Sequence, residues 1–310
     1  YDELYFEEIP GQQIIIECEK MKNLESEKNL VYKAIKLVRN RYNIKRGVKV
    51  QIVKRIPELA GLGGGSADAA AALRAINRLW NLGLSLPELA NLGLEIGSDV
   101  PFCIYNRTAR VTGRGELVEF IADMPFTYLL LVFPNFRSST REVFNRFVLH
   151  RKNQGKTTQL QKSIEKGYLH EVANASFNDL EMGINNPEIA NIKRDLIQAG
   201  ALGAVMTGSG STVCGFCLNT EKNAQQVLQN FNSISSSRFS DYKHRRQVEI
   251  YTIRSERKAP KPEFVAKVYE EKKSNELQVL ASKQTKAYAM FPLAYQAIWN
   301  DHKKILTPLS

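Results

Sequence analysis

The sequence predicts an α+β protein of two domains, and two patterns carry this prediction. Residues 48–80 have the pattern of a half-buried strand, a glycine-rich loop and a helix. After residue 126 the predicted order becomes strand, helix, strand, strand, helix, strand, which is the split βαβ arrangement of a ferredoxin-like domain. We therefore place a domain boundary near residue 125.

The elements of the first domain follow from hydrophobic periodicity and from capping signals. Three consecutive isoleucines favour an early strand, and Ser85-Leu-Pro-Glu88 is a capping box with proline in the first helical turn. Several short strands are expected between residues 101 and 120. We predict strands at 12–17 and 48–53, and helices at 29–43, from about 67 to 80, and from 85 to about 94.

The second domain carries the ferredoxin-like elements and one insertion. The apolar run at 128–133 has the length of a buried strand, and the basic, polar residues near 151–165 predict an exposed helical insertion. Further strands are predicted at 204–206, 212–216 and 248–254, helices at 139–147, 187–200 and 221–230, and a loop at 233–238. A basic extension of unknown role follows at 258–310.

Composition indicates a soluble globular protein. Hydrophobic residues make up 43% of the 310 residues and charged residues 24%, no apolar run is long enough to cross a bilayer, and no signal-peptide pattern occurs. Four cysteines do not form a disulfide framework, which favours a reducing, cytoplasmic setting. Cys214 and Cys217 fall in a predicted strand, three positions apart, so their thiols would face opposite sides and serve as small buried hydrophobes rather than metal ligands.

The net charge of +11 is concentrated late in the chain, since residues 238–310 hold seven of the eleven excess positive charges. A basic tail is more often solvated than specific, and a modestly basic body suits an anionic substrate. We therefore expect no membrane partner and no specific nucleic-acid partner. Binding of a protein or nucleic acid through the tail stays open as an alternative.

The glycine loop at residues 61–66 is the strongest functional signal. Glycine lets a backbone approach a ligand closely, and a helix N-terminus offers free N–H groups with a partial positive charge. A strand, a glycine loop and a helix start together form a cradle for phosphate. A bare flexible turn explains the segment less well. The Walker A and dinucleotide fingerprints do not fit, because Ser66 and Ala67 stand where those motifs need other residues.

Six stretches together resemble the GHMP kinases, and within them the 4-diphosphocytidyl-2-C-methyl-D-erythritol kinase family. The similarity runs over about residues 1–255. The stretches are KRIPELAGLGGGSADAAAAL at 54–73, IGSDVPF at 96–102, GRGE at 113–116, NLVYKA at 29–34, NDLE at 178–181 and MTGSGST at 206–212.

The resemblance implies a two-domain GHMP kinase fold. A ribosomal protein S5 domain 2-like, ATP-binding N-terminal domain would cover 1–125, incomplete at its start, and a ferredoxin-like C-terminal domain would cover 126–257. It also implies ATP-dependent phosphorylation of the 2-hydroxyl of 4-diphosphocytidyl-2-C-methyl-D-erythritol, a step of non-mevalonate isoprenoid biosynthesis. The partners would be this small molecule, ATP and Mg²⁺, in a monomer or homodimer. No carboxylate pair in the sequence indicates the metal ligands.

The resemblance assigns most candidate residues to the nucleotide. Asn29 matches the adenine side, although a helix N-cap explains it equally well. Lys54 could lie near the nucleotide, although a solvated lysine at a strand end is at least as common. The phosphate-binding segment would comprise Pro57, Glu58, Leu59, Ala60, Gly61, Leu62, Gly63, Gly64, Gly65, Ser66 and Ala67.

Asp99 is the candidate catalytic base, because the resemblance places the family's aspartate there; residue type alone would suggest a turn. Val100 precedes a proline and is expected to be extended, which would fix the direction of Asp99. Thr140 and Asn178 resemble acceptor-side positions. The loop of Gly208, Ser209, Gly210 and Ser211 would contact the acceptor; Ser211 replaces the usual proline, which predicts a looser loop.

The resemblance also implies two segments that would precede Tyr1, a PAKINL-like strand and a Gly-Tyr-His segment for the cytidine end. The lysine of the first stabilises the transferring phosphoryl group, and loss of such a partner costs about two to three decades of rate. We therefore expect residues 1–310 alone to fold imperfectly and to phosphorylate slowly. Two other functions stay open: another GHMP small-molecule kinase, and a non-catalytic or weakly active protein that binds nucleotide or a partner.

Overall fold

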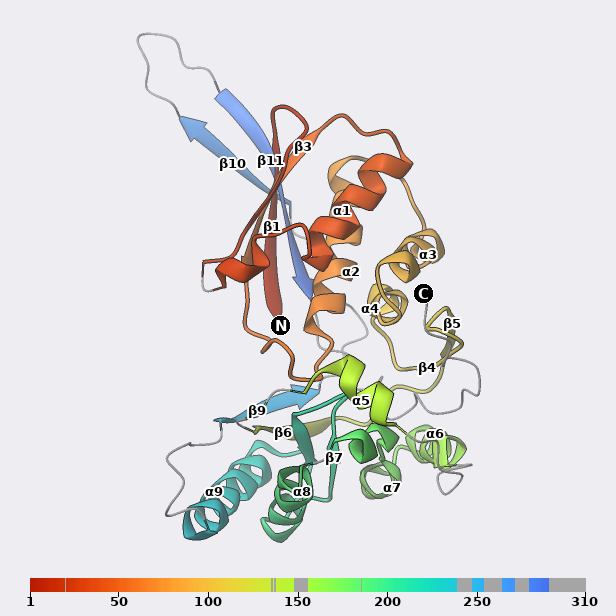
Figure 1. Cartoon of the computed structure of the whole chain (residues 1–310), viewed down its shortest axis with the longest axis vertical. Helices are drawn as coiled ribbons and strands as arrows, with labels where there is room; N and C mark the ends of the chain where they lie inside the picture. The colour runs from red at the N-terminus through yellow and green to blue at the C-terminus, as the bar shows by residue number, and fades with distance from the viewer. Residues whose placement is uncertain are drawn as a thin grey trace.

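The chain forms two α+β halves with separate sheets, so the predicted fold class is confirmed (Figure 1). The first half carries the N-terminal elements and the second half begins with the strand that follows residue 126. The computed structural model describes residues 1–310 except 20, 135, 137, 148–155, 185, 239–246, 254–263, 271–278 and 290–310.

The first half is a mixed sheet covered by helices. Its sheet has the order β10-β11-β1-β3-β2, in which β2 runs parallel to β3 and the other pairs are antiparallel. The elements in chain order are β1 (Asp2–Ile9), β2 (Ile14–Glu17), η1 (Lys22–Leu24), α1 (Leu30–Arg41), β3 (Gly47–Val53), α2 (Gly64–Leu79), α3 (Leu86–Ile96), α4 (Val100–Tyr105), β4 (Ala109–Thr112) and β5 (Leu117–Phe120).

Helix α2 lies in the centre of the first core, and its alanines explain why. Six of its alanines are buried, which lets the helix pack closely against α1, α4 and β1 without bulky side chains. Alanine also has the highest helix propensity, so the same residues make the helix stable and thin. The start of this helix is therefore held firmly relative to the sheet.

Two strands from the C-terminal part of the chain complete the first sheet. They are β10 (Phe264–Glu270) and β11 (Val279–Ala289), which pair antiparallel with each other. β11 also pairs antiparallel with β1, with Ala289 opposite Asp2. The sequence left open whether residues 258–310 pack onto the rest of the protein; the described parts of this extension do.

The second half has the ferredoxin-like sheet order β7-β8-β6-β9, with all neighbours antiparallel. The predicted split βαβ order is therefore confirmed. Its elements are β6 (Thr127–Phe133), α5 (Thr140–Arg146), α6 (Lys156–Lys166), α7 (Leu169–Ala175), η3 (Asp179–Gly183), α8 (Glu188–Gln198), β7 (Gly203–Met206), β8 (Val213–Phe216), α9 (Glu221–Arg238) and β9 (Gln247–Ile253).

Both faces of the second sheet are buried, which explains the uninterrupted apolar run of β6. Leu130 and Val132 face α8 and α9, whereas Leu129 and Leu131 face a core that includes Leu160 of α6. The expectation of an exposed insertion at 151–165 is thus wrong for α6, because its apolar side chains cover one face of the sheet. The same core contains Ile56, Ala60 and Leu62, so the chain around the glycine loop packs against the second half.

Two local predictions are wrong. Val100 is not extended but begins α4, because Pro101 occupies the first helical turn, where its missing N–H and its ring meet no preceding carbonyl. The expected loop at 233–238 is the end of α9, which continues to Arg238. There Ser233 donates from Oγ to the carbonyl oxygen of Gln229 at 3.0 Å, which keeps this serine compatible with the helix.

Candidate active site

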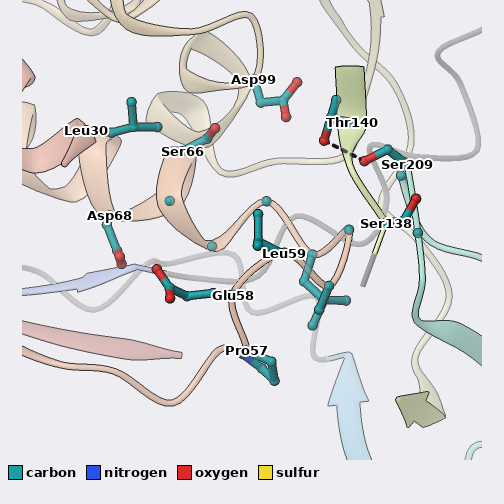
Figure 2. A pocket seen from close by; sticks show the side chains of 18 of the residues that line it. Leu30, Pro57, Glu58, Leu59, Ser66, Asp68, Asp99, Ser138, Thr140 and Ser209 are labelled. Atoms are coloured by element: carbon teal, nitrogen blue, oxygen red, sulfur yellow. Dashed lines mark hydrogen bonds between the residues drawn. The ribbon is translucent and has the colours of Figure 1, made fainter. Parts of the chain in front are cut away.

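A cavity of about 700 Å³ lies where the two halves meet, a size that suits a small-molecule ligand (Figure 2). It is lined from the first half by the glycine loop and Asp99, and from the second half by Thr140 and the 208–210 segment. Predicted site residues that line it are Asn29, Lys54, Pro57, Glu58, Leu59, Ala60, Gly61, Leu62, Gly63, Gly64, Gly65, Ser66, Asp99, Thr140, Asn178, Gly208, Ser209 and Gly210.

The glycine loop (residues 61–66) presents the head of α2 to this cavity. The helix begins at Gly64, three residues earlier than expected, and Gly63 precedes it in the left-handed region with a φ of 64° and no side-chain cap. The N–H of Ala67 donates to the carbonyl oxygen of Gly63 at 3.0 Å. The amides of the three residues before Ala67 therefore have no acceptor within the helix, and they face a cavity at the positive end of the helix dipole. This arrangement suits phosphate oxygens.

Gly61 brings the glycine loop into contact with a second loop, residues 207–212, which we call the acceptor loop. Gly61 has a φ of +72°, and a Cβ there would lie 2.2 Å from the carbonyl oxygen of Thr207 and 2.8 Å from that of Gly210. The N–H of Thr212 donates to the carbonyl oxygen of Ala60 at 3.3 Å. Only glycine fits at this contact, which joins two loops that both line the cavity.

Lys54 forms a buried charge cluster beneath the glycine loop. Its Nζ lies 2.5 Å from Oδ2 of Asp2 and 2.6 Å from Oδ2 of Asp68, and the residue is 8% exposed. Burial alone lowers the pKa of Lys54, but the charges of Asp68 and Asp2 outweigh it and raise that pKa above its usual value. Lys54 is therefore not a solvated lysine, and its charge is already matched by two carboxylates.

The two carboxylates of this cluster differ in their surroundings. Oδ1 of Asp2 accepts the N–H groups of Arg55 at 2.6 Å and Ile56 at 2.8 Å, which ties β1 to the start of the loop connection. Oδ1 of Asp68 is buried and has no hydrogen-bond partner among the described residues. Burial raises the pKa of Asp68 to about 7, although Lys54 opposes this. The cluster has two carboxylates and one cation, so Asp68 is its proton-binding member.

Asp99 directly precedes the short helix α4 without a side-chain capping bond, and it lies in the cavity wall between Ser66 of α2 and Thr140 of α5 (Figure 2). The GRGE segment supports this position from behind. A Cβ on Gly115, whose φ is +120°, would lie 1.9 Å from the carbonyl oxygen of Ser98. The close packing of Gly115 against Ser98 holds the backbone directly before Asp99, which fixes the point from which the Asp99 side chain enters the cavity.

The second half contributes hydroxyl and amide groups to the same cavity. Oγ1 of Thr140 and Oγ of Ser209 form a hydrogen bond of 2.8 Å between α5 and the acceptor loop (Figure 2). Asn29 caps α1 by accepting the N–H of Val31 at 2.9 Å and also lines the cavity, so its two predicted roles are compatible. Asn178 lines the cavity but its amide is bonded to backbone carbonyls.

Two predicted site residues do not line the cavity. Ala67 is 2% exposed and packs in the first core. Ser211 is buried, and its Oγ donates to the carbonyl oxygen of Phe136 at 2.6 Å. The expectation that serine loosens the acceptor loop is wrong in this respect, because the hydroxyl anchors the loop to the chain between β6 and α5.

Sequence reasoning missed several cavity residues. Ser98 and Asp68 belong to quoted motifs and could have been found there, and Ser138 lies next to the predicted helix start before Thr140. Leu30 and Leu180 also lie in quoted motifs, whereas Leu24, Lys28 and Phe144 are apolar or basic side chains brought in by folding, for which the sequence holds no separate signal. The residues missed are Leu24, Lys28, Leu30, Asp68, Ser98, Ser138, Phe144 and Leu180.

The cysteines of the CxxC pair lie outside this cavity. Cys214 and Cys217 are buried at β8, and burial raises the pKa of both thiols, that of Cys217 to about 11. Both are therefore uncharged at neutral pH and pack as small apolar side chains, as predicted.

Comparison with known proteins assigns this chain to a family. The GHMP kinases N terminal domain matches residues 29–107, and the GHMP kinases C terminal domain matches residues 160–234. A protein of Staphylococcus haemolyticus, provisionally named 4-diphosphocytidyl-2-C-methyl-D-erythritol kinase, is 41% identical over 234 residues, which cover 74% of this chain and 82% of that protein. The chain belongs to the GHMP kinases. A Staphylococcus aureus relative with the same name is 39% identical to this GHMP kinase over 233 residues, with the same coverage of both chains.

Solved structures agree with this assignment. A crystal structure of 4-(cytidine 5'-diphospho)-2C-methyl-D-erythritol kinase is 25% identical to this GHMP kinase with a TM-score of 0.63, and covers 80% of this chain and 85% of that one. A homoserine kinase from Cytophaga hutchinsonii is 18% identical with a TM-score of 0.64, covering 81% and 85%, and supports the fold alone.

Proposed function

We propose that this GHMP kinase transfers the γ-phosphoryl group of ATP to the 2-hydroxyl of 4-diphosphocytidyl-2-C-methyl-D-erythritol, a step in isoprenoid precursor synthesis. The observation that carries the proposal is that the free amides at the start of α2 and the carboxylate of Asp99 line the same cavity. The substrate assignment is supported by relatives of this name at about 40% identity over most of their length.

The roles of the residues follow from the chemistry of phosphoryl transfer. The amides of Gly64, Gly65 and Ser66 would bind phosphate oxygens and, with the α2 dipole, offset their negative charge. Asp99 would accept the proton of the attacking hydroxyl as the new oxygen–phosphorus bond forms and the bond between the γ-phosphorus and the bridging oxygen breaks. Thr140 and Ser209 would orient the alcohol on the side of the second half.

Mg²⁺ fits this cavity as an ion that arrives with ATP. Over the described ranges no cluster of three His, Cys, Asp or Glu residues could form a protein-only metal site. Mg²⁺ in kinases needs only one or two protein oxygens beside phosphate and water. The Ser66 hydroxyl at the head of α2 would be one such oxygen, because Ser66 lines the cavity beside the helix amides. When bound, the ion would neutralise phosphate charge.

We also propose a cytoplasmic location and a monomeric or homodimeric state. Within the part of the chain that the structure describes, no helix is long and apolar enough to cross a membrane. The four cysteines are free and buried, as is usual for proteins of a reducing compartment.

Asp99→Asn tests the proposal in a coupled ATP assay. An amide of the same size cannot accept the proton, so kcat should fall by about 10²- to 10⁴-fold while nucleotide affinity stays within about threefold. Asp123→Asn, on the exposed connection before β6, is the matched control and should leave kcat unchanged.

The same assay with homoserine, mevalonate and galactose distinguishes this alcohol from those of other GHMP kinases. Faster turnover of one of these three would overturn the substrate assignment. Nucleotide binding without turnover of any alcohol, or an Asp99→Asn enzyme as fast as the wild type, would favour the non-catalytic function instead.

A further inference from the structure

The η3 turn (Asp179–Gly183) and its cap Asn178 grip the backbone at the start of the acceptor loop. The Nδ2 group of Asn178 donates to the carbonyl oxygens of Met206 at 2.8 Å and Gly208 at 2.7 Å. Its Oδ1 accepts the N–H of Leu180 at 3.0 Å. Both amide hydrogens of Asn178 are thereby used by the protein, so this side chain cannot donate to a substrate without releasing the loop.

Glu181 binds the same stretch of backbone, but as a hydrogen-bond acceptor rather than as a donor. Its Oε1 accepts the N–H of Met206 at 2.9 Å, while its Oε2 accepts from Nζ of Lys193 at 2.6 Å. Met206 therefore has both its N–H and its carbonyl group bound by side chains of one short turn. Lys193 on α8 fixes the direction of the Glu181 carboxylate.

The η3 turn also contacts the helix that presents Thr140. Gly183 packs against α5 so closely that a Cβ on it would lie 2.5 Å from the carbonyl oxygen of Val143. One rigid turn thus contacts both α5, which carries Thr140, and the loop that carries Ser209. These are the two residues that form the 2.8 Å hydroxyl pair in the cavity.

The acceptor loop in turn contacts the glycine loop directly, so the position of one depends on the position of the other. The carbonyl oxygen of Thr207 lies against Gly61, and the N–H of Thr212 donates to Ala60. A shift of the acceptor loop therefore changes where the phosphate cradle lies relative to Asp99, without removing any group that would bind either substrate.

We propose that Asn178 and Glu181 are positioning residues for phosphoryl transfer. They hold the acceptor loop in its place relative to both α5 and the glycine loop. Asn178 acts through the backbone of Met206 and Gly208 rather than as the substrate ligand that its sequence motif suggested. This inference rests on the kinase function proposed above. It predicts a loss of rate rather than a loss of binding, because the loops would keep their ligand groups but lose their alignment.

Asn178→Asp is the decisive variant, because a carboxylate has the same shape but no hydrogen to donate to the two carbonyls. We expect kcat to fall by about 10- to 100-fold, with KM for ATP and for the alcohol within about threefold. Amide hydrogen exchange over residues 206–212 should become at least about tenfold faster. Asn186→Asp is the matched control, because the Oδ1 of Asn186 accepts the N–H of Glu188, which an aspartate oxygen does equally well.

Two outcomes would overturn the inference: a rise in the KM for the alcohol with unchanged kcat, which indicates direct substrate contact, or unchanged exchange and kcat. If Asn178→Asp does not fold, Glu181→Ala and Glu181→Gln decide. The alanine variant should lose rate, and glutamine, which still accepts the N–H of Met206, should restore it. Equal rates would contradict the positioning role of Glu181. If the wild type phosphorylates no alcohol, the proposed function fails, but hydrogen exchange still tests whether Asn178 and Glu181 hold the acceptor loop.

Discussion

Gly61→Ala tests the contact between the glycine loop and the acceptor loop most directly. The added methyl group would lie 2.2 Å from the carbonyl oxygen of Thr207 and within 3 Å of two backbone atoms of Gly210. All three neighbours are backbone atoms, so no side-chain rotation can relieve the overlap. The two loops must therefore separate.

The size of the effect follows from the geometry. An ordinary van der Waals contact of a Cβ atom begins at 3.4 Å, so the loops must move apart by roughly 1 Å. Alanine at a φ of +72° costs about 1 kcal/mol, and weakening the hydrogen bond between Thr212 and Ala60 costs about 1 kcal/mol more. A misplacement of about 1 Å between reacting groups is worth about 100-fold in rate.

We therefore expect Gly61→Ala to lower the free energy of unfolding by about 2 kcal/mol and kcat by about 100-fold. Urea unfolding and a coupled ATP assay measure the two effects. Gly11→Ala is the matched control, because Gly11 has a φ of +81° but no atom within 4 Å of its added Cβ. It should lose about 1 kcal/mol of stability and no rate. A Gly61→Ala enzyme within threefold of wild-type kcat would refute the reasoning.

Two further variants test the surroundings of the cavity. Burial raises the pKa of Asp68 to about 7, so the folded state binds more protons than the unfolded state between about pH 4 and 7. The free energy of unfolding therefore falls as the pH rises through this window, by on the order of 4 kcal/mol. Asp68→Asn should remove this slope in urea unfolding at pH 4 to 7, and an unchanged slope would contradict the assignment. Ser211→Ala should lower the free energy of unfolding by about 1–2 kcal/mol, because it removes the hydrogen bond to the carbonyl oxygen of Phe136. Ser233→Ala is the control and should cost less than about 0.5 kcal/mol, because its exposed hydroxyl bonds within α9. Equal losses would show that the Ser211 hydroxyl does not stabilise the loop.

The parts of the fold that the sequence predicted correctly are those written in local patterns. The apolar run of β6, the capping box at Ser85 and the split βαβ order each depend on residues close together in the chain. The glycine loop was also predictable, because glycine before an alanine-rich helix has few structural uses besides close approach to a ligand.

The contacts within the cavity were not predictable in the same way. Lys54 meets Asp2 and Asp68, and Ser211 meets Phe136, across separations that no local pattern records. At Val100 a local rule was misleading. A residue before proline prefers an extended backbone, but helix α4 begins at Val100 and places Pro101 in its first turn. Asn178 lines the cavity, but the partners of its side-chain amide are backbone atoms that the sequence could not identify.

The packing of Gly61 against Thr207 has a consequence for how ligands bind. In the function proposed above, the glycine loop would bind the nucleotide and the acceptor loop the alcohol, and their close packing means that neither loop can shift without displacing the other. If the first ligand orders this shared contact, the second ligand binds without the free-energy cost of ordering it. By thermodynamic reciprocity, ATP must then change the affinity for the alcohol by the same factor as the alcohol changes the affinity for ATP.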